Sequence, residues 1–170
     1  MLFLSPECYI ARHSFQKGQT MKIYVDADAC PNAIKDILYK AALRCHCELI
    51  LVANQPLSVR RHPLIKTIQV TKGFDVADQY IADTIVAGDL VITADIPLAS
   101  MVIAKHATAL NPRGEMYTKE NISNKLATRN LMDELRGSGV ISGGPQKMNT
   151  SHLQQFANAL DRYLAKYHKN

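Results

Sequence analysis

The chain has 170 residues, of which 47% are hydrophobic and 21% charged, with a net charge of +5. This length and apolar content suffice for a packed core without disulfide crosslinks. No stretch approaches the 18 apolar residues of a membrane span, and the N-terminus lacks the basic and apolar segments of a signal peptide, so we expect a cytoplasmic protein with no membrane partner.

The hydrophobic pattern predicts alternating strands and helices from Met21 onward, after a tail of residues 1–20 without periodicity. Strands are expected at 22–25, 48–53, 65–70, 90–93 and 108–110, and helices at 31–42, 75–86, 97–104, 121–136 and 151–167. Residues 137–145 carry four glycines and a proline and are expected to form a loop, either a lid or a plain connection. The pattern predicts one domain over residues 21–170, a three-layer α/β/α fold with a mainly parallel sheet of four or five strands.

Four cysteines, Cys8, Cys30, Cys45 and Cys47, fit neither a disulfide framework nor paired zinc knuckles. The run Cys45-His46-Cys47 has the residue types of a zinc site. However, it leads into an apolar strand, where its two cysteines would share one face. Buried thiols are therefore favoured over zinc.

Aspartates gather where the expected strands end. Asp26 and Asp28 follow the first strand, Asp95 follows the fourth, and Asp75 and Asp78 share one face at the start of a helix. Functional groups in parallel sheets collect beyond the carboxyl ends of the strands. We therefore expect these five side chains at one edge of the sheet.

Each of these acids also has a structural interpretation, because Asp28, Asp75 and Asp95 all precede helices and could cap them. Taken together, however, neighbouring carboxylates repel one another, and a cation or a proton must offset the repulsion. Mg²⁺ or Mn²⁺ suits such an all-oxygen set, and zinc is less suited without histidine. Asp89 precedes the fourth strand and is expected at the opposite end, and Asp83 is expected to point elsewhere on its helix.

Basic residues are concentrated in the second part of the chain. Residues 105–170 hold 10 Lys and Arg against 5 Asp and Glu, whereas residues 21–104 hold 8 against 9. A basic surface beside an acidic site suits a polyanionic substrate, although an ordinary solvated surface has the same composition. Arg113, Arg129 and Arg136 are candidates to bind phosphate, or else form salt bridges. Asn54, after the second strand, is a candidate to orient substrate or water.

Several long motifs resemble the YaiI/YqxD family of bacterial proteins. They are VDADACP (Val25–Pro31), VAN (Val52–Asn54), GFDVADQYI (Gly73–Ile81), GDLVITADIPLA (Gly88–Ala99), ALNPRGE (Ala109–Glu115), RNLMDELRGSG (Arg129–Gly139) and GGP (Gly143–Pro145). The resemblance extends from Met21 to about Leu164 and says nothing about the first 20 residues.

That family is similar to PIN-like domains, which are often Mg²⁺- or Mn²⁺-dependent ribonucleases. The resemblance implies that Asp26 ends the first strand as a metal ligand and that Asp75 or Asp78 supplies an acid from a central helix. It also matches Thr93-Ala94-Asp95 to an acid that follows a threonine after the fourth strand. The glutamate usual on the intervening helix has no clear counterpart here, unless Asp28 replaces it. The resemblance thus implies a metal site of Asp26, Asp28, Asp75, Asp78 and Asp95, with RNA or another phosphate-bearing molecule as the substrate.

Two other interpretations remain open. The sequence VDADAC is similar to the opening of haloacid-dehalogenase-like phosphatases, with Asp26 as nucleophile, Asp28 as general acid/base and Thr93 as a phosphoryl contact. Against this interpretation, Cys30 stands where that motif usually has Thr or Val. The third interpretation is a nucleic-acid- or nucleotide-binding module without catalysis, whose acids hold a structural ion. The sequence does not indicate an oligomeric state.

Overall fold

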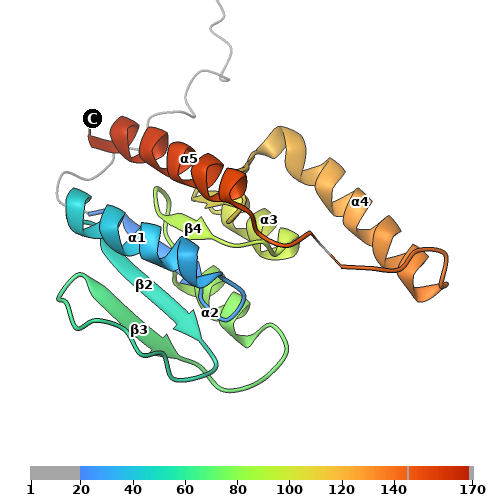
Figure 1. Cartoon of the computed structure of the whole chain (residues 1–170), viewed down its shortest axis with the longest axis horizontal. Coiled ribbons are helices and arrows are strands. Elements are labelled where there is room, and N and C mark those ends of the chain that lie inside the picture. Colours follow the sequence, from blue (N-terminus) through green and yellow to red (C-terminus); the bar gives the residue numbers. More distant parts are fainter. Residues whose placement is uncertain (1–19, 145, 169–170) are drawn as a thin grey trace, which may run out of the picture.

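A six-stranded sheet runs through the middle of the computed structural model, which describes residues 20–144 and 146–168 (Figure 1). Its strands are β1 (Lys22–Asp26), β2 (Glu48–Ala53), β3 (Ile65–Gln69), β4 (Leu90–Ile92), β5 (Thr108–Leu110) and β6 (Met116–Tyr117). They lie in the order β3-β2-β1-β4-β5-β6. All neighbours are parallel except β5 and β6. The five parallel strands therefore end at one edge of the sheet, called the carboxyl edge below.

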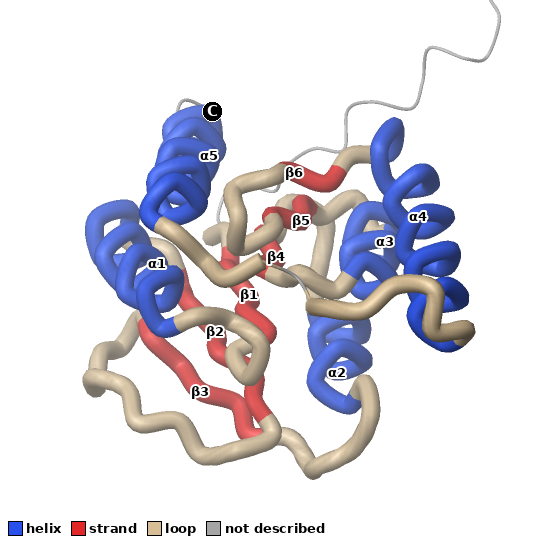
Figure 2. Tube along the Cα trace, turned by 45° about the vertical axis from the view of Figure 1, so that its right-hand side comes forward, coloured by secondary structure: helices blue, strands red, loops and turns tan. Residues whose placement is uncertain are grey.

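Helices cover both faces of the sheet (Figure 2). The five are α1 (Asn32–Cys45), α2 (Val76–Thr84), α3 (Ile96–Ala104), α4 (Lys119–Gly137) and α5 (Thr150–His168). Helices α1 and α5 lie on one face, and α2, α3 and α4 lie on the other. This arrangement confirms the predicted three-layer α/β/α fold.

Alternation along the strands separates two apolar cores. In β1, Ile23 and Val25 belong to the core beneath α1 and α5, whereas Tyr24 belongs to the core beneath the other three helices. Successive side chains of a strand point to opposite faces, so a strand covered on both sides is apolar throughout. This is why β1, β2 and β4 appear in the sequence as continuous hydrophobic runs.

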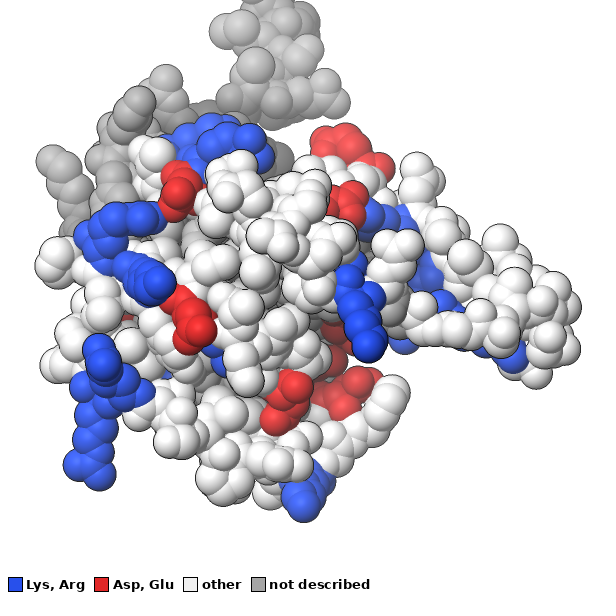
Figure 3. Space-filling model, in the orientation of Figure 1, with Lys and Arg blue, Asp and Glu red and all other residues white. Residues whose placement is uncertain are grey.

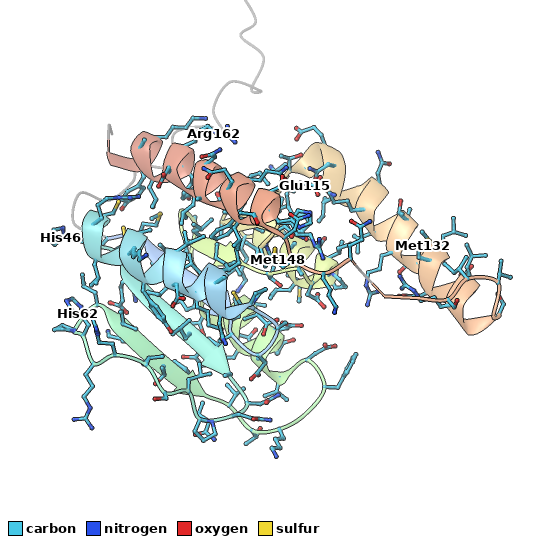
Figure 4. All side chains as sticks on the ribbon, in the orientation of Figure 1. His46, His62, Glu115, Met132, Met148 and Arg162 are labelled. Atoms are coloured by element: carbon cyan, nitrogen blue, oxygen red, sulfur yellow. The ribbon has the colours of Figure 1, made fainter. Side chains whose placement is uncertain are left out.

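The fourth helix extends beyond the sheet (Figure 1). Among its residues only Ile122 is buried, while Leu131 and Met132 are 54% and 41% exposed. Figure 4 shows Met132 on the outer part of this helix, away from the strands. A capping box fixes the first turn: the Thr118 hydroxyl accepts from the Asn121 N–H, and the Asn121 side chain accepts from the Thr118 N–H.

The structure adds details that the sequence pattern did not predict. Strand β6 was not expected, because two residues are too few to show alternation. The loop expected at 137–145 begins one residue later, since Gly137 still belongs to α4. Pro145, Cys8 and the tail up to residue 19 lie outside the described residues. In the part of the chain that is described, no helix is both long and apolar enough to cross a bilayer.

Candidate functional site

The order of the strands reverses between β1 and β4. From β1 the chain adds β2 and β3 on one side, and then crosses over to add β4 and β5 on the other. Ligands of open α/β sheets bind in the crevice that such a reversal leaves at the carboxyl edge. Val25 pairs with Ile92 in the register of these strands, so Asp26 and the segment Thr93–Asp95 leave the sheet side by side.

Asp26, the last residue of β1, faces other carboxylates. Its pKa is raised from 3.8 to about 6, mainly because burial removes water from the carboxylate, and further by the charges of Asp28 and Asp95. A hydrogen bond from the Ala29 N–H opposes this rise. The structure therefore brings together three of the acids that the sequence predicted to meet.

Asp78 adds a further carboxylate to this group, from the first turn of α2. Burial raises its pKa from 3.8 to about 7, and the charges of Asp95, Asp26 and Asp75 add to the rise. Within residues 20–144 and 146–168, no basic side chain lowers the pKa of either Asp78 or Asp26. We call Asp26, Asp78 and Asp95, with Asp28 and Asp75 beside them, the acidic cluster. Figure 3 shows acidic side chains gathered at this edge, with a basic side chain beside them.

Asp95 has a structural role within the acidic cluster. Its Oδ1 accepts a 2.8 Å hydrogen bond from the Leu98 N–H and caps α3. Its own N–H donates to the Thr93 hydroxyl over 2.9 Å. Thr93 is 1% exposed, so this contact orients Asp95 from beneath, and a substrate contact by Thr93 stays a prediction. The capping interpretation thus holds for Asp95, whose Oδ2 is not part of this cap.

Asp28 and Asp75 do not cap helices. Asp28 Oδ2 accepts from the Asn54 N–H over 2.7 Å, which links the loops that follow β1 and β2. The N-cap position of α1 is Pro31, and no side chain caps this helix with a hydrogen bond. Asp75 precedes α2 in the left-handed conformation, with φ 58°, and its side chain makes no capping hydrogen bond. Left-handed backbone is costly for residues other than glycine, and aspartate tolerates it better than most.

Asp89 and Asp83 lie apart from the acidic cluster, as expected. Asp89 is 3% exposed, and its two oxygens accept from the Lys22 and Val86 N–H groups at the start of β1 and β4. It therefore joins segments at the opposite edge of the sheet. Asp83 is exposed and bonds to Gln79 on its own helix.

Of the three predicted phosphate-binding arginines, Arg113 lies at the carboxyl edge, because it follows the parallel strand β5. Its N–H donates to Asn111 Oδ1, and its guanidinium contacts the Gln146 carbonyl and the His152 ring. His152 was missed as a partner, because a contact between residues 39 positions apart leaves no pattern in the sequence. Asn111 is a local partner, two residues before Arg113, and was missed although Asn at this spacing is typical of a turn.

Arg129 and Arg136 lie on α4, where both contact Asp133 at 3.5 and 3.1 Å. Both arginines therefore form salt bridges, which was the alternative to phosphate binding, and the structure does not bring them to the acidic cluster.

The predicted zinc alternative finds no geometric support. Among residues 20–144 and 146–168, no three His, Cys, Asp or Glu side chains are arranged so that they could hold a metal ion as they stand. Burial raises the pKa of Cys30 to about 12 and that of Cys47 to about 11, which keeps both thiols neutral. His46 and His62 precede β2 and β3, at the opposite edge from the acids (Figure 4).

The absence of a ready-made three-ligand arrangement applies to the acidic cluster as well. Its carboxylates influence one another electrostatically, but they do not yet converge on one point. Binding of a cation would therefore require side-chain rotation. A shallow hollow at the same edge is lined by Gln55, Pro56, Leu57, Thr67, Ile68 and Gln69, and by none of these acids.

Residues 24–166 match the family model described as "Uncharacterized BCR, YaiI/YqxD family". The chain is 58% identical over 146 residues to a UPF0178 protein of Dechloromonas aromatica, which covers 86% of this chain and 97% of the relative. It is 54% identical over 149 residues to a UPF0178 protein of Psychromonas ingrahamii, with 88% and 99% covered. No solved structure matches the chain at a significant level. The extent and identity of these matches show that the chain belongs to the YaiI/YqxD family.

Proposed function

We propose that the acidic cluster binds Mg²⁺ or Mn²⁺ and that the protein is a metal-dependent nuclease acting on RNA. One observation carries the proposal: the pKa values of Asp26 and Asp78 are raised to about 6 and about 7 by burial and by other carboxylates, and no basic side chain of the described residues lowers either pKa. A divalent cation would remove this repulsion. Because all the donors are carboxylate oxygens, hard cations fit them best.

Each residue at the carboxyl edge has its own role in this proposal. Asp26, Asp78 and Asp95 would hold the cation, and Asp28 and Asp75 would complete or support that set. When bound, such a cation polarises a phosphodiester and lowers the pKa of water for in-line attack. Arg113 would bind phosphate oxygens with its guanidinium, and Asn54 would orient the substrate or water. Thr93, which is buried, would act through Asp95 by holding its N–H. The resemblance to PIN-like domains supports the same assignment of Asp26 and Asp95.

The chain offers a matched pair of variants to test this proposal. Asp78 and Asp83 lie on the same helix, five residues apart, but only Asp78 belongs to the acidic cluster. Asp78→Asn should abolish calorimetric Mn²⁺ binding and Mn²⁺-dependent cleavage of labelled single-stranded RNA, whereas Asp83→Asn should leave both unchanged. If the native protein binds no Mn²⁺, or both variants behave alike, the acidic cluster is not the metal site.

A binding module without catalysis is the second candidate, because the carboxylates do not converge on a preformed metal site. It predicts RNA binding with no turnover of RNA, DNA or a phosphomonoester under any divalent cation. The phosphatase alternative predicts the opposite for a phosphomonoester such as p-nitrophenyl phosphate. One panel of substrates with native protein and Asp26→Asn separates the three functions.

A further inference from the structure

Phe74 is the most exposed of the large hydrophobic residues in the described part of the chain. Its side chain is 93% exposed, whereas the next, Val140, is 69% exposed. Burial of a phenylalanine contributes about 1.5–3 kcal/mol to stability. This ring contributes almost none of that, so packing within the folded chain does not explain its presence.

The loop that carries Phe74 is anchored on both sides. At its start, the Val70 N–H donates to the Ala53 carbonyl over 2.9 Å. At its end, the Asp75 carbonyl accepts from the Gln79 N–H in the first turn of α2. A Cβ on Gly73 would lie 2.7 Å from Val76 Cγ2, so the backbone before Phe74 also packs closely on α2. The short segment that carries Phe74 is therefore held at both of its ends.

Phe74 borders the acidic cluster. It directly precedes Asp75 and stands four residues before Asp78, at the carboxyl edge of the sheet. Its neighbour Lys72 is exposed and has no salt bridge among the described residues. From Thr71 to Asp75 every residue is exposed, and Phe74 is the only large hydrophobic residue in this segment. Aromatic anchors of protein interfaces, by contrast, sit within apolar surroundings.

We infer that Phe74 stacks on a base of single-stranded RNA whose backbone passes the acidic cluster, with Lys72 contacting a phosphate. The inference rests on the proposed function and names the form of its substrate. An exposed aromatic ring with a basic residue close to it in the chain is typical of a platform for an unpaired base, because every base has a flat face to stack. Bases within a duplex are already stacked on one another, so the platform favours single strands.

The absence of tryptophan from the chain allows a direct test. Phe74→Trp introduces a single tryptophan at the platform, which can be excited at a wavelength where the tyrosines do not absorb, and stacking of a base on indole quenches its emission. Oligouridine mixed with this variant and Mn²⁺ in a stopped-flow instrument should quench the emission before turnover, and an abasic oligomer of the same length should not. Val86→Trp is the matched control, because Val86 is 45% exposed and lies at the opposite edge, beside Asp89.

Steady-state kinetics supply a second measurement. Phe74→Ala should raise KM for single-stranded RNA about tenfold, which corresponds to about 1.4 kcal/mol and lies within the range for loss of one stacked base. The value of kcat should remain within about twofold. Phe74→Tyr should restore KM, because tyrosine retains the flat ring.

The outcomes separate the two proposals. Quenching of Phe74→Trp without cleavage by native protein would support the platform and refute the nuclease. Cleavage by native protein with no quenching, or with equal quenching by the abasic oligomer, would overturn the platform and leave the nuclease intact. A shift in emission with protein concentration alone, without RNA, would show self-association at Phe74 and would also overturn the inference.

Discussion

The carboxylates of Asp26 and Asp78 lose water on folding, and no basic side chain in the described part of the chain offsets this loss. The pKa of Asp78 rises from 3.8 to about 7, so the folded state binds more protons than the unfolded chain between these values. The free energy of unfolding must therefore decrease as pH rises through this window. Stability contributed by protonated Asp78 is fully present below pH 3.8 and is lost above about pH 7.

Asp78→Asn should remove this pH dependence. At pH 8 without metal, the variant should be more stable than native protein by about 1 kcal/mol, after allowance for solvent screening of a half-exposed group, or roughly 2–4 °C in Tm. Near pH 4 the difference should vanish. Thermal denaturation followed by circular dichroism at several pH values measures it. Asp83→Asn should show no such trend, and equal curves for both variants would contradict the electrostatic description of the site.

The individual aspartates illustrate how far sequence patterns reach. Their positions after strands placed Asp26 and Asp95 at one edge, because strand direction alone determines which end a residue occupies. The sequence offered Asp28, Asp75 and Asp95 alike as helix caps. It did not indicate that Asp95 caps α3 whereas Asp28 bonds to the Asn54 N–H, since the choice between them depends on loop geometry. The exposure of Phe74 was equally unpredictable, because a lone aromatic in a polar stretch is usually buried by distant segments.

At the level of elements, one glycine controls how the turn between β5 and β6 packs on α5. Gly114 has φ +92°, and a Cβ there would lie 2.5 Å from the Gln155 carbonyl carbon and 2.6 Å from the Phe156 nitrogen. These atoms are helix backbone and cannot move aside easily. Gly139 has a similar φ of +76°, but a Cβ added there would meet nothing within 4 Å.

Gly114→Ala and Gly139→Ala should therefore separate backbone strain from steric overlap. Gly139→Ala should cost about 1 kcal/mol, the usual penalty for alanine in the left-handed region. Gly114→Ala should cost about 3 kcal/mol or more, because overlap with the helix adds to the same strain. Urea denaturation of both variants gives the two values. If they are equal, the contact between this turn and α5 is not a constraint on the fold.

The capping box of α4 gives a second prediction for an element. Thr118→Ala should lower the free energy of unfolding by about 1 kcal/mol, because the Asn121 N–H loses its acceptor. Thr128→Ala on the exposed middle of the same helix is the control, and it should be neutral or slightly stabilising since alanine is the better helix former. Equal losses in both variants would show that α4 does not depend on its cap. Urea denaturation again measures the change.

For the whole molecule, the order of the strands determines the site. Hydrophobic runs in the sequence predict where β1 and β4 lie along the chain, but their pairing joins residues more than 60 positions apart. No local pattern encodes which strands become neighbours. The reversal of strand order between β1 and β4, which brings Asp26 beside Asp95, was therefore available only from the structure.

Attachment of α5 to the rest of the molecule depends on its apolar face rather than on its salt bridge. Phe156 is fully buried in the core shared with α1 and β1. Arg44 and Asp161 also join α1 to α5 over 2.6 Å, but their side chains are 60% and 57% exposed. Exposed pairs contribute about 0–1 kcal/mol, because solvent screens them and ordering long side chains costs entropy.

Phe156→Ala should thus destabilise the protein by about 3–5 kcal/mol, through lost burial and the cavity left behind, whereas Asp161→Asn should cost less than about 1 kcal/mol. Denaturant unfolding at low and high salt measures both losses. Added salt should reduce the difference in the free energy of unfolding between native protein and Asp161→Asn, because salt screens the ion pair. Comparable losses in the two variants would mean that the ion pair holds α5 in place.

Helix α5 also packs against the turn at Gly114, so Phe156→Ala and Gly114→Ala should both weaken the same contact. The double variant should therefore lose less free energy of unfolding than the two single losses combined.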